Sequence, residues 1–179
     1  MEVWLPSAAD WSGRFQGTGN GGFSGSIYTQ LLAAGVERGD AVANSDQGHE
    51  AANPLLGAAD ASFIVGHPQS FIDFGYRATH LMTEVGKAIT AAFYGREPSY
   101  NYFNGCSSGV RQALKEAQDF PADYNGIIAG DPANDWVNLN FGQAYEVQVN
   151  EINPVATIPP IAYSLINQAV LTNAAVKTG

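Results

Sequence analysis

A serine between two glycines, at the junction of an apolar segment and an amphipathic one, constrains the fold of this chain most. The run Gly105–Gly109 has the pattern G-x-S-x-G, follows the strand-like Tyr100–Phe103 and precedes the helical pattern of Gln112–Phe120. A strand-to-helix turn of this kind is a nucleophile elbow, which exposes its serine hydroxyl at the edge of a sheet. The pattern predicts Ser107 as a catalytic nucleophile and the Ser108 N–H, at a helix N-terminus, as an oxyanion donor. An ordinary glycine-rich turn is the alternative, because short motifs also occur by chance.

Short strands and amphipathic helices alternate along the first 135 residues, as in an α/β fold with a doubly wound, mostly parallel sheet. Strands are expected at Val3–Leu5, Arg14–Gln16, Asp40–Ser45, Tyr100–Phe103 and Gly126–Ala129. Helices are expected near residues 27–35, where Gly35 is the stop, and at about Phe71–Tyr94 and Gln112–Phe120. Helical spacing in the longest helix predicts a packed face made of Phe74, Ala78, Leu81, Val85, Ala88 and Ala92.

The pattern changes near Asp135. Aromatic residues at Trp136, Phe141 and Tyr145 lead into the helical run that begins at Pro159. We therefore expect residues 1–135 and 136–179 to form two separate parts of the protein.

A second glycine-rich run, Gly17–Gly22, offers two interpretations. With Asp46 at the end of the next strand, it resembles the G-x-G-x-x-G fingerprint of a dinucleotide-binding oxidoreductase domain. The run Phe23–Ser26 argues against this, because the third glycine of the fingerprint should already lie in a helix. In a hydrolase the same loop would follow the third strand, and its backbone N–H groups, near Gly21 and Gly22, would complete an oxyanion hole.

Composition excludes several function classes. The formal net charge is −9 with only 8 Lys and Arg residues, which argues against nucleic acid or an anionic membrane as a partner. No apolar stretch approaches the ~18 residues that span a bilayer. The N-terminus lacks a signal-peptide pattern, and Cys106 is the single cysteine.

Four blocks carry a family resemblance: GRFQGTGNGG, ANSDQGH, YRATH and the long elbow block that runs from Tyr102 to Trp136. Together they resemble the tannase/feruloyl esterase family of α/β-hydrolases, from about Val3 to Leu171. Two positions depart from the family pattern, because Val110 stands where a second glycine is usual and Asp131 where alanine is usual. We expect Val110 to crowd the first helical turn, so that Val110→Gly would be tolerated or improve activity.

The resemblance implies an incomplete α/β-hydrolase core followed, in residues 136–179, by the start of an inserted helical lid. It implies a secreted serine esterase that cleaves hydroxycinnamoyl or galloyl esters of small phenolic molecules through an acyl-enzyme. The catalytic Asp and His would lie beyond this chain, which alone would be inactive and poorly soluble without the remainder of its polypeptide. Cys106 would pair with a cysteine beside that histidine. The lid would carry a structural calcium ion, with no metal or other cofactor bound by this chain itself.

Three histidines remain as possible internal bases. On this fold the triad order is Ser, then acid, then His, and none of His49, His67 and His80 follows Ser107. His80 is expected on the helix surface as a solvated or hydrogen-bonded residue, and His67 is expected in a loop. Asp46 and His49 leave the end of a strand and are interpreted as loop-ordering or pocket residues. A catalytically dead binding protein with the hydrolase fold is the remaining alternative.

Overall fold

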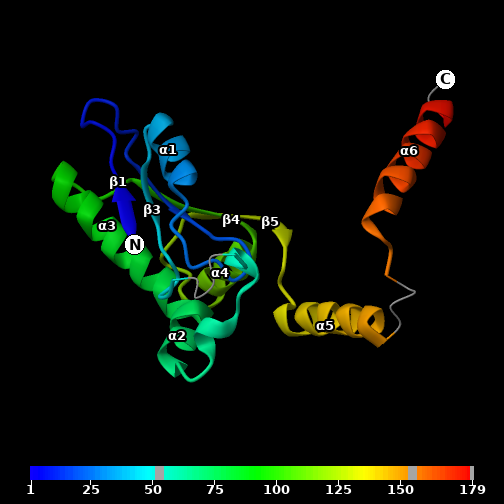
Figure 1. The fold of residues 1–179 in the computed structure, drawn as a ribbon. Coiled ribbons are helices and arrows are strands. Elements are labelled where there is room, and N and C mark those ends of the chain that lie inside the picture. The colour runs from blue at the N-terminus through cyan, green and yellow to red at the C-terminus, as the bar shows by residue number, and fades with distance from the viewer. Residues whose placement is uncertain (51–54, 153–156, 178–179) are drawn as a thin grey trace. The chain divides into compact units, whose positions relative to one another are not determined.

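The computed structural model describes residues 1–50, 55–152 and 157–177, with side chains up to Asn173. The chain divides into two compact units, Met1–Asn134 and Asp135–Gly179. The division lies where the sequence pattern changes. Each unit is described separately (Figure 1).

The first unit is built on a five-stranded sheet with the order β1-β3-β2-β4-β5. Only the edge strand β1 is antiparallel to its neighbour, and the other pairs run parallel. The strands are β1 (Glu2–Trp4), β2 (Arg14–Thr18), β3 (Ala41–Asn44), β4 (Tyr100–Ser107) and β5 (Gly126–Pro132). The predicted fold class, an α/β-hydrolase core with a mostly parallel sheet, is confirmed.

Helices cover both faces of this sheet. They are α1 (Thr29–Glu37), α2 (Pro68–Ile72), the π-helical turn η3 (Asp73–Arg77), α3 (Ala78–Tyr94) and α4 (Ser108–Asp119), with the short 3₁₀ turns η1 (Gly57–Ala59) and η2 (Ser62–Ile64). In α1, Gly35 lies against the side chain of Val42, and in α3, Gly86 lies against Ala43. Successive residues of a strand point to opposite faces, so α1 and α3 cover opposite faces of β3.

The predicted end of α1 at Gly35 is wrong. Gly35 is a buried residue inside the helix, where a Cβ atom would overlap the Val42 side chain. The helix ends instead before Gly39, which has a φ of +79° and turns the chain into β3. Gly35 therefore permits close packing of helix on strand, and Gly39 makes the turn.

The predicted packed face of the long helix is confirmed at Phe74, which is 7% exposed, and is wrong farther along, within α3. Leu81 and Val85 are 46% and 42% exposed, whereas the buried residues are Thr79, Met82, Thr83, Gly86 and Thr90. The hydroxyls of Thr83 and Thr90 donate to helix carbonyls four residues earlier, so their burial leaves no polar group unpaired. Small residues on this face bring α3 close to the sheet, where Gly86 meets the Phe15 ring.

The hydrophobic core lies between the sheet and α3 and α4. The buried members of this core come from segments that are far apart along the first unit: Trp11, Phe15, Ala41, Ala43, Met82, Phe103, Ala113 and Tyr124. Phe15 and Phe103, on the adjacent strands β2 and β4, are fully buried. They fix the two strands whose carboxyl ends carry the candidate site.

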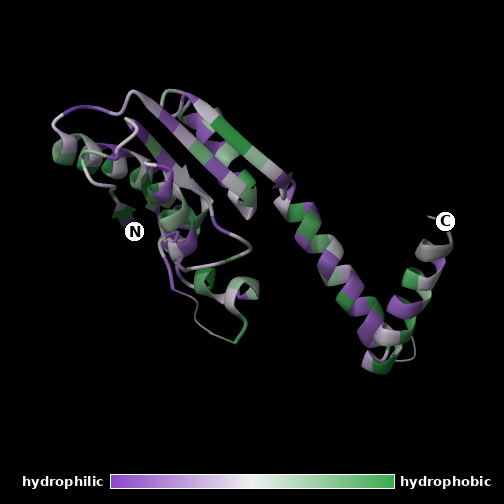
Figure 2. Cartoon of the chain, turned by 90° about the horizontal axis from the view of Figure 1, so that it is seen from above, coloured by the Kyte–Doolittle hydropathy of each residue, from purple (hydrophilic) through white to green (hydrophobic). Residues whose placement is uncertain are grey.

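The second unit contains α5 (Trp136–Ile152) and α6 (Pro160–Lys177). Hydrophobic residues are distributed along both helices (Figure 2). Side chains such as Val137, Phe141 and Ile161 are more than 70% exposed. Within the described ranges, no helix combines the length and the hydropathy that a membrane span requires.

Val110→Gly is expected to lower the free energy of unfolding by about 2–3 kcal/mol, from lost burial and from helix propensity. Val110 is 1% exposed in the first turn of α4, so its removal takes away a buried side chain. Chemical denaturation measures the change. Ala117→Gly, at an exposed position of the same helix, should show the propensity cost alone. Equal losses in the two variants would mean that Val110 contributes nothing by packing.

Candidate active site

Ser107 occupies the turn between β4 and α4. The strand extends four residues beyond the predicted Phe103 and the helix begins immediately afterwards, at Ser108. Ser107 has φ 57° and ψ −119°, a conformation that costs a non-glycine residue about 1–3 kcal/mol. The residue is exposed, and its hydroxyl makes no hydrogen bond within the described part of the chain. This geometry presents an exposed serine hydroxyl at the carboxyl edge of the sheet.

The two glycines of the motif are required by backbone contacts. A Cβ atom on Gly105 would overlap the carbonyl of Gly109, in the first turn of α4. A Cβ on Gly19 would lie 2.7 Å from Gly109 Cα, and one on Gly109 would lie 3.1 Å from the Asn20 carbonyl oxygen. The elbow and the loop after β2 therefore touch backbone to backbone.

Asn20 holds this loop in place with buried hydrogen bonds. Its side-chain amide donates to the carbonyls of Ser26 and Ser45, each at 2.9 Å, and its Oδ1 accepts from Gln47 Nε2 at 3.2 Å. The Asn20 backbone N–H donates to Gln112 Oε1 at 3.1 Å, which connects the loop to α4. No sequence pattern indicates these roles for Asn20 and Gln112, because most of their partners are distant along the chain.

The proposed oxyanion donors differ in their surroundings. Ser108 is fully buried at the start of α4. The Gly21 N–H donates to the Tyr28 hydroxyl oxygen at 3.2 Å, so Tyr28 occupies this donor. Gly22 has a φ of +56° and packs against the Ala58 carbonyl. Tyr28 was not predicted, and its hydroxyl proton makes no hydrogen bond within the described residues.

Asp46 and His49 order a neighbouring loop. Asp46 accepts from the Gly48 N–H at 3.1 Å. His49 stacks on Phe63 with a centroid distance of 3.5 Å, and its Nε2 lies 2.9 Å from the Phe23 carbonyl oxygen. No hydrogen bond joins either side chain to Ser107 in the described part of the chain. Their observed contacts are those of loop-ordering residues.

The dinucleotide interpretation is not favoured by this geometry. Gly17 and Thr18 lie inside β2, and a Cβ atom on Gly17 would overlap the Tyr124 hydroxyl. The next helix, α1, begins only at Thr29. No helix N-terminus therefore stands directly after the glycine run to receive a pyrophosphate.

Two further side chains lie at the same edge of the sheet. Cys106 is an exposed free thiol beside Ser107. Asp131 has a φ of +55°. Its neighbours in β5, Gly130 and Pro132, pair with Cys106 and Ser107 of β4. The register shift at this point places an exposed carboxylate residue directly across from the elbow.

Arg111 supports the elbow helix from the side. Its Nη1 donates to the Gly75 carbonyl at 2.9 Å, and its guanidinium lies 4.3 Å from the Phe74 ring centroid. Burial lowers the pKa of Arg111 to about 10, so the group stays charged at neutral pH. This contact ties α4 to η3.

The other two histidines lie apart from the elbow. His67 is exposed at the start of α2. His80 is half-buried, with its Nδ1 2.9 Å from Asp123 Oδ2, and its predicted hydrogen-bonded state is observed. His80, Glu116 and Asp123 form a possible metal-binding group among the described residues. Its imidazole does not fit the all-oxygen ligand set of calcium.

Gln112→Met is expected to reduce kcat about tenfold and the free energy of unfolding by about 1–3 kcal/mol, because it leaves the buried Asn20 N–H unpaired. Steady-state kinetics and denaturation together measure both effects. The matched control is Gln118→Met, at an exposed position of α4. Unchanged kinetics in the Gln112 variant would show that the loop holds its position without this bond.

Known proteins are similar to this chain in sequence and in fold. The sequence pattern described as "Tannase and feruloyl esterase" matches residues 1–179. A probable feruloyl esterase B-2 of Aspergillus flavus is 46% identical over 138 residues, which are 77% of this chain and 25% of that protein. An uncharacterised esterase of Xanthomonas campestris is 38% identical over 177 residues, which are 99% of this chain and 30% of that protein.

A solved structure agrees with these matches. The crystal structure of feruloyl esterase B from Aspergillus oryzae superposes with a TM-score of 0.68 at 37% identity, over 76% of this chain and 25% of that chain. The chain thus spans 25% and 30% of the length of the two sequence relatives. The fold, the strand–serine–helix elbow and the sequence matches all point to the same family, and the chain belongs to the tannase and feruloyl esterase family.

Proposed function

We propose that the protein hydrolyses carboxylic esters with Ser107 as its nucleophile. The observation that carries the proposal is the Ser107 backbone, held at φ 57° and ψ −119° between a parallel strand and a helix N-terminus. A strained serine of this kind persists only where the surrounding packing enforces it, and such strain is concentrated at functional sites. The glycine contacts of Gly19, Gly105 and Gly109 supply that enforcement.

The reaction proceeds in two acyl-transfer steps. Ser107 Oγ attacks the ester carbonyl, a histidine base takes its proton, and the alcohol leaves with that proton. The oxyanion accepts a hydrogen bond from the Ser108 N–H, at the positive end of α4. A second donor comes from the loop after β2, either Gly21 once Tyr28 releases it or the Tyr28 hydroxyl itself. Water then attacks the acyl-enzyme and frees the acid and Ser107.

The acid and the base of the triad are proposed to lie in the part of the relatives that these 179 residues do not cover. None of the described contacts of His49, His67 or His80 reaches Ser107, and the chain spans only 25% of the Aspergillus flavus relative. By the same resemblance, Cys106 is proposed to form a disulfide with a cysteine beside that histidine. Secretion and a structural calcium ion in the lid are proposed on the same ground.

The substrate class proposed is an ester of a hydroxycinnamic or gallic acid. Support comes from the names of the matching family and of the Aspergillus relatives. The exposed Asp131 carboxylate beside the elbow disfavours substrates that carry a negative charge near the reacting carbonyl.

A fluorophosphonate probe tests the nucleophile directly. The full-length polypeptide, which supplies the proposed histidine base, is incubated with the probe and digested, and the modified peptide is sequenced by mass spectrometry. The expected result is one label on Ser107, with no label on the fully buried Ser108. Hydrolysis of a soluble feruloyl ester and a galloyl ester then separates the two substrate classes. A label elsewhere, together with ester turnover, would refute the assignment of Ser107.

A further inference from the structure

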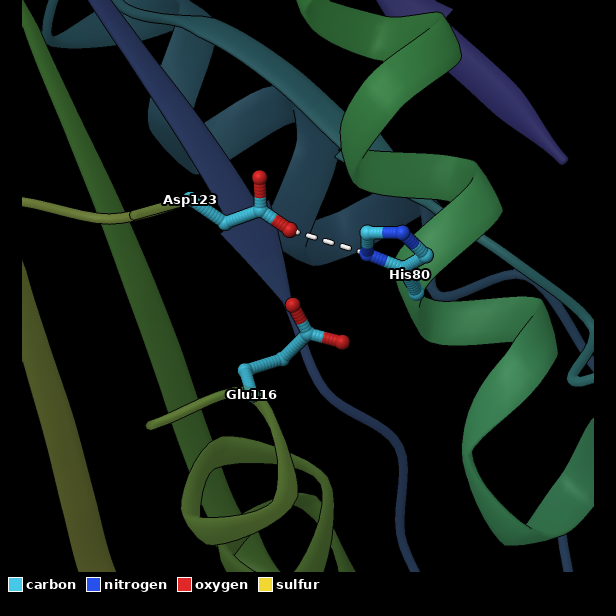
Figure 3. Close-up of side chains that lie close together, drawn as sticks. All are labelled: His80, Glu116 and Asp123. Atoms are coloured by element: carbon cyan, nitrogen blue, oxygen red, sulfur yellow. Dashed lines mark hydrogen bonds and ion pairs between the residues drawn. The ribbon is translucent and has the colours of Figure 1, made fainter. Parts of the chain in front are cut away.

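A cluster of metal-ligand residues lies at the far end of α4 from Ser107. His80 comes from α3, Glu116 from the last turns of α4, and Asp123 from the segment before β5. One ligand atom from each residue lies within 4.8 Å of the other two. Figure 3 shows the three side chains converging on one point between α3 and α4. The proposed esterase mechanism makes no use of any of them.

Glu116 gives the second, independent observation. The residue is 1% exposed, and among the described residues no N–H or hydroxyl donor meets either of its carboxylate oxygens. Its carboxylate points toward His80 and Asp123 (Figure 3). A buried carboxylate without such donors is costly, so such a group is expected to bind a cation or to hold a proton.

The surroundings of His80 suit a metal ligand. Its ring stacks on Phe120 with a centroid distance of 3.6 Å, which fixes the plane of the imidazole. Nδ1 faces Asp123, while Nε2 lies 3.6 Å from Glu84 Oε2. A carboxylate behind the second ring nitrogen is the usual outer contact of a metal-bound histidine, because it holds the ring and its tautomer.

We propose that His80, Glu116 and Asp123 bind one divalent transition-metal ion of the Zn²⁺ class. An imidazole combined with two carboxylates favours such an ion over Ca²⁺ or Mg²⁺, which prefer all-oxygen sites. Three protein ligands leave a fourth position for water. Asp123 and His80 are 14% and 21% exposed at their side chains, which gives the ion a route from solvent.

Two groups compete with the ion. Lys87 Nζ lies 2.8 Å from Asp123 Oδ1 and partly neutralises that carboxylate. Burial raises the pKa of Glu116 to about 8, with smaller contributions from the charge of Asp123 and from a hydrogen bond between Glu116 and Asp123. A proton shared by these two carboxyl groups therefore competes with the ion. An ion that wins this competition would tie α3, α4 and the approach to β5 together.

Titration of the chelator-treated whole protein with Zn²⁺ tests the site. Isothermal calorimetry at pH 7.5 should show a site that Glu116→Gln and His80→Gln each weaken at least about tenfold. Zn²⁺ should also raise the Tm of the wild-type protein and not that of either variant. The matched control is Asp119→Asn. Asp119 lies one turn from Glu116 on α4, pairs with Lys115 and is outside the cluster. This control should bind as the wild type does.

Several outcomes would overturn the proposal. One is a Zn²⁺ isotherm that is the same in the wild-type protein and in both variants. Another is a pair of results: the Glu116→Gln protein has a higher Tm than the wild type, and Zn²⁺ does not change the wild-type Tm. Together these results would show that Glu116 holds a proton. Far-UV circular dichroism of each variant confirms folding, and His80→Gln remains informative if Glu116→Gln does not fold. Because fluorophosphonate labelling of Ser107 does not depend on this cluster, the two proposals fail independently.

Discussion

In the full-length enzyme, which supplies the proposed acid and base, Ser107→Ala is expected to lower kcat for ester hydrolysis by a factor on the order of 10⁴–10⁶, with a small change in KM. The hydroxyl is the atom that forms the acyl-enzyme, so its removal leaves only substrate binding and the oxyanion donors, which retain a small part of the rate enhancement. The exposed Ser107 hydroxyl has no hydrogen-bond partner among the described residues. Its loss should therefore leave the free energy of unfolding nearly unchanged, and steady-state kinetics with denaturation separate the two effects.

Ser99→Ala is the matched control for this variant. Ser99 is exposed and directly precedes the opposite end of β4, and its structural bond to Gly13 uses only the backbone N–H. This variant should retain wild-type kcat and stability. A Ser107→Ala protein that kept more than a few per cent of wild-type activity would show that another group is the nucleophile.

The elbow could be predicted from sequence because its causes are local. Strand, serine and helix follow one another within Tyr100–Asp119, and the glycines that permit the turn lie inside the same motif. The parallel sheet was predictable for a similar reason, since each strand from β2 onward is joined to the next by at least one helix. The unforeseen contact was that between Gly19 and Gly109, which brings the loop after β2 onto the elbow.

The packed face of α3 was wrong because hydropathy alone does not decide which side of a helix is buried. Leu81 and Val85 form an apolar stripe, but the sheet side requires small residues, since Phe15 and Ala43 approach the backbone at Gly86. Threonines fit there because a hydroxyl bonded to its own helix carries little polar cost. His80, expected on the helix surface, is half-buried and packs on Phe120.

The supporting groups of the site depend on contacts between distant segments. Asn20 and Gln112 are 92 residues apart, and no periodicity in either segment indicates their hydrogen bond. The position of Tyr28 against Gly21 depends on where α1 begins, and the sequence placed that start two residues too early. Asp46 and His49 were predicted as loop-ordering or pocket residues, and the contacts observed order the loop. The catalytic role of Ser107 remains a prediction.

Gly105→Ala is expected to have the largest effect on folding, a loss of at least about 4 kcal/mol in the free energy of unfolding. The added methyl group would overlap the Gly109 carbonyl, which is backbone and cannot rotate away as a side chain does. Relief requires α4 to move away from β4, which would separate Gly109 from Gly19 and displace Ser107. Because natural domains have total stabilities of about 5–15 kcal/mol, little folded protein should remain. Gly75→Ala is the control, since no atom of the described residues lies within 4 Å of its added methyl group. Thermal melts of both variants and fluorophosphonate labelling of Ser107 measure the effect. A Gly105→Ala protein with the Tm and the labelling of the wild type would refute the proposed backbone contact at the elbow.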